Sequence, residues 1–375
     1  MSGAKTVLLV GTYGLHRRKS VALFAEALAA RLPALGWRVR NAVLASPLSG
    51  LARRHHSRML GTLDRLLFLR NRIQLAGLSA DLVHFTDTSD AVFLNGWFGA
   101  RATVTCHDLF FLERALKDPA TSSGQRRWQR AVRRGLDLAD GVAFVSHATE
   151  QAFRRVSRRP AGAAHERVIH NGAYQVLQTL AEPELARRLR ADLPEVAAGC
   201  YVLNVGSNFE RKNRDGVLRA FAAAALPPTI RLVMVGERML PAHDRLAAQL
   251  GIAARIVPVP EVDTRLLEAL YNGAMALLFP SFEEGFGVPI IEAQQCGCPV
   301  VCSGIPVFRE IAADSALMAP PSEPDLLGRH LRTLAEAAPR GPLVSAGRIN
   351  AARFTMEAMA SGYARFFDAV LATPR

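Results

Sequence analysis

The chain has 375 residues, of which half are apolar and 21% are charged, with a formal net charge of +13. This is the composition of a globular protein that is too long for one ordinary core, so two domains are expected. The apolar run near the start is too brief for a signal peptide, and no stretch of 18 uninterrupted apolar residues exists to cross a bilayer.

The positive charge lies in the first half of the chain. Residues 1–180 hold 26 Lys and Arg against 12 Asp and Glu, whereas residues 181–375 hold 20 against 21. This asymmetry indicates that the first half faces an anionic partner, such as a membrane surface, a nucleic acid or a phosphorylated substrate. The alternative is an arginine-rich surface that only faces solvent.

Short apolar runs alternate with amphipathic stretches in the first half. A helix is predicted over residues 20–36, closed by Gly36. Strands are predicted at residues 6–11, 37–44, 81–86, 102–107, 141–146 and 167–172.

The same alternation restarts in the second half. Strands are predicted at residues 201–206, 230–236, 254–259, 274–280, 299–303 and 315–319. No strand pattern lies in residues 173–198, so the join between domains is expected there. Alternating strands and helices predict parallel sheets covered on both faces, and hence two doubly wound α/β domains. We expect domains at 1–175 and 176–345, with C-terminal helices at 346–375 that pack back on the first domain.

Ligands of such sheets bind beyond the carboxyl ends of the strands, which draws attention to the loop after residue 280. Residues 280–301 read "PSFEEGFGVPIIEAQQCGCPVV", with Glu284 in a glycine-containing turn and Glu292 early in the following helix. Pro289 suits the first turn of that helix, whose free N–H groups can bind an anion. A stabilising charge at a helix start would explain Glu292 alone, but not the whole set.

A basic pair follows the first strand of the second half. "NVGSNFERKN" places Arg211 and Lys212 between a strand that ends at Gly206 and a helix. A guanidinium beside an ammonium suits a diphosphate, although a basic pair by itself is commonly a solvated face.

These segments resemble the family 4 retaining glycosyltransferases. The likeness rests on "ERKN" and the two-glutamate block, and extends to "LVMVGE", "VTCHDL", "FVSHAT", "VIHNGA" and the closing "RFTMEAMASGYARFF". It covers nearly the whole chain and implies the GT-B fold, in which two Rossmann-like domains face a central cleft.

The resemblance also implies roles for individual residues. Arg211 and Lys212 would hold the nucleotide diphosphate, Glu292 the ribose hydroxyls, and Glu284 the donor sugar near the reaction centre. His107 would reach the donor sugar from across the cleft. Backbone contacts to the donor would come from Gly206, Val259, Phe286, Gly287 and Val288, with the loop at 257–260 at the base edge. The loop at 11–14 would cover the acceptor or diphosphate side.

The chemistry of this set predicts a leaving-group site without metal. No Asp-x-Asp metal motif is present, and positive groups with helix-start amides stabilise the charge that grows on a departing diphosphate. The resemblance implies retention of anomeric configuration. Competing interpretations are a paired-carboxylate hydrolase, a GT-B epimerase or hydrolase, a nucleic-acid-binding protein and a degenerate binding subunit. The intact Arg211, Lys212, Glu284 and Glu292 set favours the transferase.

Partners and location follow from the remaining features. Five cysteines without an export signal indicate reduced thiols and a cytoplasmic protein, and Cys296, Cys298 and Cys302 are interpreted as packing residues rather than a zinc site. The expected partners are a nucleotide-sugar donor such as a GDP- or UDP-sugar and a carbohydrate or lipid-linked acceptor, with no nucleic acid. Basic segments at 51–77 and 125–135 predict docking on an anionic inner leaflet.

Overall fold

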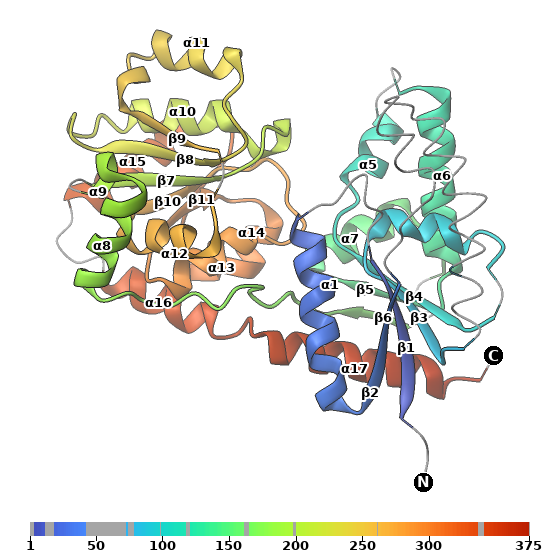
Figure 1. The fold of residues 1–375 in the computed structure, drawn as a ribbon. Helices are drawn as coiled ribbons and strands as arrows, with labels where there is room; N and C mark the ends of the chain where they lie inside the picture. The colour runs from blue at the N-terminus through green and yellow to red at the C-terminus, as the bar shows by residue number, and fades with distance from the viewer. Residues whose placement is uncertain are drawn as a thin grey trace, which may run out of the picture. The chain divides into compact units, whose positions relative to one another are not determined.

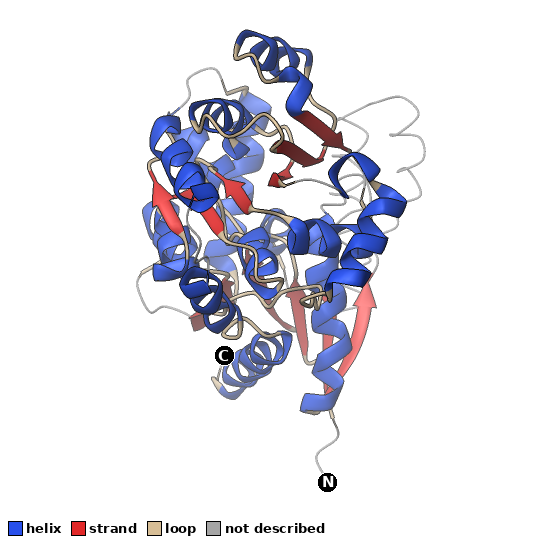
Figure 2. Ribbon diagram, turned by 90° about the vertical axis from the view of Figure 1, so that its left-hand side faces the viewer, coloured by secondary structure: helices blue, strands red, loops and turns tan. Residues whose placement is uncertain are grey.

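The computed structural model describes residues 4–11, 19–42, 73, 79–97, 99–117, 121–160, 165–197, 200–260, 262–336 and 341–374. The chain divides into two compact units, the first formed by Met1–Tyr174 with Met356–Arg375 and the second by Gln175–Thr355 (Figure 1). Within the described residues each unit has one six-stranded sheet, and all neighbouring strands are parallel. Helices flank the strands of both units (Figure 2). The predicted doubly wound α/β fold is confirmed.

The first unit has the strand order β2-β1-β3-β4-β5-β6. Its strands are β1 Lys5–Val10, β2 Trp37–Ala42, β3 Leu82–Phe85, β4 Arg101–Cys106, β5 Gly141–Phe144 and β6 His165–Val168. Its helices are α1 Lys19–Arg31, η1 Leu32–Leu35, η3 Thr88–Leu94, α5 Phe110–Lys117, α6 Ser123–Leu138, α7 His147–Val156 and α17 Met356–Ala372.

The central strands of this sheet, such as β1 and β5, are mostly buried, which explains why they read as apolar runs, whereas the edge strands β2 and β6 carry polar, partly exposed residues. Along β1, Leu8 and Val10 pack into one cluster, while Val7 and Leu9 pack into another together with side chains of α1 and α17. Helix α17 packs against β5 and β6, and Figure 1 shows it running beneath the strands of the first unit. The C-terminal helix is therefore part of the first unit's core.

The second unit has the strand order β12-β11-β10-β7-β8-β9. Its strands are β7 Tyr201–Gly206, β8 Arg231–Gly236, β9 Ile256–Val259, β10 Ala276–Phe279, β11 Val300–Ser303 and β12 Leu317–Ala319. Its helices are α8 Glu182–Asp192, α9 Pro194–Ala197, η4 Glu210–Lys212, α10 Arg214–Ala223, α11 Pro241–Gln249, η5 Ala253–Arg255, α12 Thr264–Gly273, α13 Val288–Gln295, α14 Pro306–Ala312, η6 Ala313–Ser315, α15 Pro324–Glu336 and α16 Gly341–Ala351.

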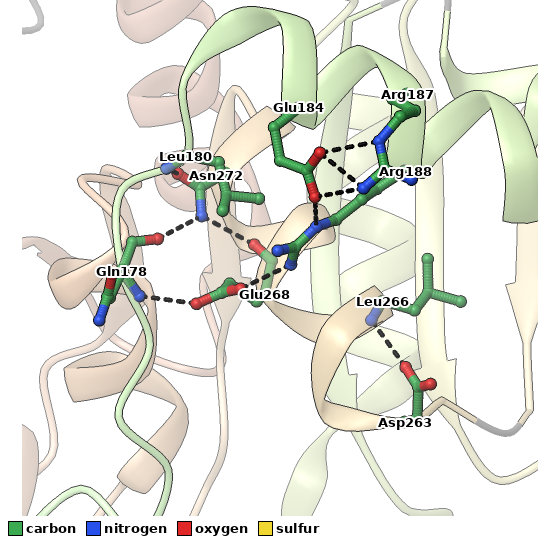
Figure 3. Close-up of polar contacts among 9 residues, drawn as sticks. All are labelled: Gln178, Leu180, Glu184, Arg187, Arg188, Asp263, Leu266, Glu268 and Asn272. Atoms are coloured by element: carbon green, nitrogen blue, oxygen red, sulfur yellow. Dashed lines mark hydrogen bonds and ion pairs between the residues drawn. The ribbon is translucent and has the colours of Figure 1, made fainter.

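The chain that enters the second unit is bound to α12 by side chains (Figure 3). Glu268 Oε1 accepts from the backbone N of Gln178 at 2.8 Å, and Asn272 Oδ1 accepts from the backbone N of Leu180 at 2.8 Å. Asn272 Nδ2 donates to the Gln178 carbonyl at 2.8 Å, and Arg188 of α8 donates to Glu268 at 2.7 Å. These contacts satisfy backbone groups that no strand pairs, and they fix residues 178–180 to the second unit.

Two expectations need correction. The last strand of the first unit was expected at 167–172 but is His165–Val168; the chain after it leaves the sheet and lies against the start of α17, where a Cβ on Gly172 would lie 2.7 Å from the Met356 backbone N. The tail expected at 346–375 is divided between the units. Helix α16 packs on α13 of the second unit, and only Met356 onward belongs to the first.

Among the residues that the structure describes, no helix has both the length and the hydropathy needed to cross a membrane. The basic segment at 51–77 lies outside them except for Ile73 and is not described further.

A histidine that sequence analysis did not single out lies at the centre of the first unit. His84 of β3 is fully buried, and its ring nitrogens lie 2.9 Å from the hydroxyls of Thr103 and Thr105. Thr105 in turn bonds to Tyr363 of α17 at 2.9 Å. Burial, with a smaller contribution from the charge of His107, lowers the pKa of His84 from 6.5 to about 3.

We predict that this histidine makes the first unit lose stability on acidification. The unfolded chain binds a proton on His84 below pH 6.5, whereas the folded chain binds one only near pH 3. Stability therefore falls as pH drops below 6.5, with a slope that approaches about 1.4 kcal/mol per pH unit from this group. Urea unfolding between pH 5 and 7 measures this slope. Most carboxyl groups have pKa values of about 4 and do not titrate in this range.

The His84→Asn variant, which retains a polar side chain but cannot protonate, should lose this part of the slope. His147→Asn is the control, because that side chain is 63% exposed. Equal slopes for the wild type and His84→Asn would contradict the assignment.

Candidate functional site

In the second sheet, the order in which the chain adds strands reverses between β7 and β10. From β7, the chain proceeds outward to β8 and β9, and from β10 it proceeds the opposite way to β11 and β12. The loops that follow these two neighbouring strands therefore diverge at the carboxyl edge, which is where doubly wound sheets bind ligands. One loop leads from Gly206 to η4, and the other from Phe279 to α13.

Glu284 joins the two loops through ion pairs with both predicted cations. Its Oε2 lies 2.9 Å from Arg211 Nη1, and its Oε1 lies 2.6 Å from Lys212 Nζ. The hydroxyl of Ser281 donates to the same Oε1 at 2.9 Å, and Arg211 also donates to the Glu283 carbonyl at 3.3 Å. The structure thus brings together three of the residues that the sequence selected separately.

These contacts keep Glu284 ionised. Its side chain is only 8% exposed, and burial alone would raise its pKa. The charges of Lys212 and Arg211, with hydrogen bonds from Lys212 and Ser281, outweigh burial and hold the pKa of Glu284 below its usual value of 4.5. A carboxylate in this state accepts hydrogen bonds and is a poor proton donor at neutral pH.

Asn213, the last residue of the "ERKN" segment, fixes the backbone next to Arg211 and Lys212. Asn213 has φ 53°, and its Oδ1 accepts from the Gly216 backbone N at 3.0 Å to cap α10. Its Nδ2 donates to the carbonyls of Pro280 at 2.9 Å and Pro321 at 3.0 Å. The Phe282 backbone N also donates to the Arg211 carbonyl at 2.8 Å, so the two loops are fixed by backbone as well as by charge.

The start of α13 depends on a glycine. Gly287 has φ 107°, and a Cβ there would lie 2.8 Å from the Phe308 ring. Phe286 is buried and packs edge-on against Phe354, with ring centroids 5.6 Å apart. Val288 begins the helix, followed by Pro289. The turn therefore has a fixed shape. Pro289 has no N–H and the Ile290 N–H donates to the Gly287 carbonyl at 3.0 Å, so in this turn the N–H of Val288 is the group that can face the same edge as Glu284.

Glu292 has a different partner from Glu284. It lies on α13 with 8% of its surface exposed, and its Oε2 accepts from the hydroxyl of Tyr271 at 2.9 Å. Tyr271 of α12 is fully buried, and burial followed by the charge of Glu292 raises its pKa well above 10. Tyr271 therefore donates to Glu292 and orients it. No pattern in the sequence pointed to this tyrosine.

The remaining predicted residues are placed as follows. Gly206 ends β7, and its carbonyl accepts from Arg214 at 2.7 Å. Val259 ends β9 and is buried. His107 follows β4 in the first unit, where its Nε2 bonds to the Thr86 carbonyl at 2.9 Å. Because a carbonyl only accepts, Nε2 carries the proton. Residues 12–14 lie outside the described part of the chain, and the donor roles of these residues stay predictions.

The cysteines lie in the interior, as interpreted from the sequence. Cys296, Cys298 and Cys302 are each less than 5% exposed and carry free thiols. Burial raises the pKa of Cys302 to about 12, so this thiol is unreactive at neutral pH. Among the described residues, no group of three or more His, Cys, Asp or Glu side chains could hold a metal ion.

Two family models match the chain and together cover most of it. Residues 187–340 match Glycosyl transferases group 1, and residues 21–173 match Glycosyltransferase Family 4. The chain belongs to the family 4 glycosyltransferases. It is accordingly a hexosyl-transferring enzyme of class EC 2.4.

Curated relatives span both units. O-antigen chain mannosyltransferase B of Escherichia coli is 27% identical over 267 residues, which cover 68% of this chain and 67% of that protein. D-inositol 3-phosphate glycosyltransferase of Salinispora tropica is 28% identical over 373 residues, which cover 90% of this chain and 74% of that protein.

Solved structures identify the fold as GT-B. Sucrose-phosphate synthase from Thermosynechococcus elongatus has a TM-score of 0.76 at 22% identity, covering 98% of this chain and 99% of that one. WaaG, a glycosyltransferase involved in lipopolysaccharide biosynthesis, has a TM-score of 0.73 at 15% identity, covering 98% and 100%. Anabaena HepE in complex with UDP and glucose has 0.74 at 19%, covering 97% and 100%.

We predict that Glu284→Gln destabilises the second unit. The amide keeps the shape but removes the charge, and leaves two partly buried cations side by side. The expected loss is about 1–3 kcal/mol of unfolding free energy at neutral pH. Because the pKa of Glu284 is lowered, its contribution is present above pH 4.5 and is lost as the pH falls through the lowered value.

Urea unfolding of the wild type and the variant at neutral pH measures this difference. Glu336→Gln is the matched control, since Glu336 is an exposed glutamate at the end of α15. A Glu284→Gln variant as stable as the control variant would show that the ion pairs contribute nothing.

Proposed function

We propose that this glycosyltransferase moves a hexosyl unit from a nucleoside diphosphate sugar to a carbohydrate or lipid-linked acceptor. We further propose that it retains the anomeric configuration, uses no metal ion and acts in the synthesis of a cell-surface glycan. The single observation that carries the proposal is the cluster of Arg211, Lys212 and Glu284. It lies at the carboxyl edge of the second sheet, between β7 and β10, where the strand order reverses.

The charge of this cluster suits a diphosphate. Two cations share one carboxylate, so the three side chains together keep one positive charge at the edge where α13 begins with Val288. A departing nucleoside diphosphate gains negative charge as the bond to the sugar breaks, and fixed positive groups stabilise that charge most in the transition state. This arrangement supplies what a metal ion would otherwise supply.

Glu284 and Glu292 are suited to contact two different parts of one nucleotide-sugar donor. The first is ionised and held by cations, and the second is oriented by Tyr271. Both accept hydrogen bonds, as sugar and ribose hydroxyls require. A paired-acid hydrolase would need one of the two carboxyl groups to act as the acid, and the lowered pKa of Glu284 excludes Glu284 from that role.

The names of similar proteins support the proposed role in glycan synthesis and the proposed substrates. The Escherichia coli relative is named as an O-antigen chain mannosyltransferase, and WaaG is involved in lipopolysaccharide biosynthesis. HepE was crystallised with UDP and glucose, and in another structure with UDP-glucose. A nucleotide-sugar donor and a carbohydrate acceptor are therefore the substrates to test first.

A thermal-shift panel of UDP, GDP, ADP and their hexose conjugates tests the donor. One base should stabilise the protein by about 2.7 kcal/mol at a concentration 100 times its Kd, which corresponds to an increase of several degrees in Tm. With that donor and a glycan acceptor, transfer should persist in excess chelator, and NMR of the product should show the donor's anomeric configuration.

Three results would contradict this function. They are no stabilisation by any member of the panel, loss of transfer in chelator that divalent metal restores, and an inverted product. Sugar release that is equal with and without acceptor would instead favour the hydrolase, and conversion of the donor to an isomer would favour the epimerase.

We also propose that the first unit docks from the cytoplasm on an anionic membrane leaflet. Arg126, Arg127, Arg130 and Arg134 are exposed on α6. Trp128 of the same helix packs on Phe111, with ring centroids 5.1 Å apart. The attraction is therefore expected to be electrostatic, at about 1 kcal/mol per basic residue near the surface.

Flotation with vesicles of anionic and of neutral lipid tests this docking. The wild type should float only with anionic vesicles at low salt, and a double variant with Arg126→Glu and Arg130→Glu should float less. Arg245→Glu, an exposed arginine of α11 in the second unit, is the control. Absence of flotation, or flotation that does not depend on lipid charge, would overturn the proposal.

A further inference from the structure

A cavity of about 470 Å³ lies in the second unit beside the donor site, and the predicted roles do not use it. It is formed by the loop between β7 and η4, the starts of α10 and α15, His243 of α11 and Phe282. Its volume falls within the range of about 300–1,000 Å³ that is usual for small-molecule sites. Lys212, Glu284 and Glu292 are not among its lining residues.

Two aromatic side chains form apolar walls of this cavity. Phe209 is 66% exposed and Phe282 is 42% exposed, although phenylalanine is normally buried. The guanidinium of Arg211 lies 5.8 Å from the centre of the Phe209 ring. Exposed aromatic faces at the rim of a cavity are typical of a ligand site.

A hydrogen-bond donor and a hydrogen-bond acceptor lie next to each other in the cavity. Asp215 Oδ1 lies 3.7 Å from His243 Nε2. His243 Nδ1 accepts from the Leu240 backbone N at 3.2 Å, so Nε2 carries the proton. Burial lowers the pKa of His243 more than Asp215 raises it, which keeps the ring neutral at pH 7. A neutral N–H beside a carboxylate matches a pair of hydroxyl groups, each of which both donates and accepts.

Arg214 adds a nearly buried donor to the lining. Only 3% of the residue is exposed, and its terminal nitrogens donate to the carbonyls of Gly206 and Glu237 and to the side chain of Asn208, each at 2.7 Å. Its Nε is buried and has no hydrogen-bond partner among the described residues. These three bonds hold the guanidinium of Arg214 in place in the wall of the cavity.

The charges that line the cavity are balanced. Arg214 and Arg219 contribute two positive charges, and Glu210 and Asp215 contribute two negative charges. An anionic ligand would gain nothing overall from such a lining and would meet the carboxylate of Asp215. A neutral ligand with an apolar face and a rim of hydroxyl groups fits the set better.

We propose that this cavity is a saccharide subsite that binds one or two neutral sugar residues of a glycan. A pyranose ring places its C–H face against an aromatic ring and its hydroxyls toward groups such as Asp215 and His243. The choice of a saccharide rests in part on the proposed function, whereas the cavity and its polar groups do not. The backbone bond from Phe282 to Arg211 connects the subsite to the donor-binding loops.

Saturation-transfer NMR on the whole protein tests the subsite. The probes are methyl α-mannoside, methyl α-glucoside, N-acetylglucosamine and maltose, each with the stabilising nucleoside diphosphate at saturation, so that the donor site is filled. At least one probe should bind. Asp215→Ala and Phe209→Ala should each weaken it about tenfold, as expected when a contact worth roughly 1.4 kcal/mol is lost.

Asp314→Ala and Ile349→Ala are the controls, because both residues are exposed and neither lines the cavity. They should bind the probe as the wild type does. Circular dichroism of each variant verifies its fold.

Three outcomes would overturn the subsite: no probe binds, binding is equal in all variants, or inorganic phosphate binds at Asp215 and Phe209 while sugars do not. Nucleotide binding is measured in the same samples. A wild type that binds a saccharide probe but no nucleoside diphosphate would contradict the proposed function and not the subsite. A wild type that binds the nucleoside diphosphate but no saccharide probe would contradict the subsite alone.

Discussion

The ion pairs of Glu284 with Arg211 and Lys212 are the interaction on which the proposed donor site depends. They are made between two loops that are far apart in the sequence but follow adjacent strands, β7 and β10. The sheet brings the loops together, and the charges then select one arrangement of them. Because Glu284 is nearly buried, the pairs form in surroundings where charge interactions are stronger than on an open surface.

The surroundings of this cluster limit how it can move. Asn213 bonds to carbonyls on two other segments, and the Phe282 backbone bonds to Arg211. Such fixed geometry is what catalysis by charge requires, since groups that are already in position need not reorganise as the reaction proceeds. The same scaffold shapes the neighbouring cavity, so donor and saccharide would be held by one rigid part of the second unit.

The sequence was sufficient to predict the fold because the central strands of each sheet are mostly buried. The central strands appear as apolar runs, whereas the edge strand His165–Val168 is polar and was placed two to four residues too late. Arg211, Lys212 and Glu284 could be found because they follow such runs. The contacts could not: no spacing rule links Tyr271 to Glu292, or marks Arg214 as buried, since these depend on how α12 and the β7 loop pack. The tail was misassigned because nothing in the sequence marks where the chain passes from α16, which packs on α13, to α17, which packs on β5 and β6.

The most direct test of the account is a calorimetric comparison of Arg211→Ala with the wild type. The titrants are the nucleoside diphosphate that stabilises the protein and its parent nucleoside. We expect the variant to bind the diphosphate about 10–100 times more weakly, the loss of roughly 1.5–3 kcal/mol that accompanies a hydrogen bond to a charged group. The nucleoside should bind both proteins equally. Equal binding of the diphosphate to both proteins would show that the cluster of Arg211, Lys212 and Glu284 is not the diphosphate site.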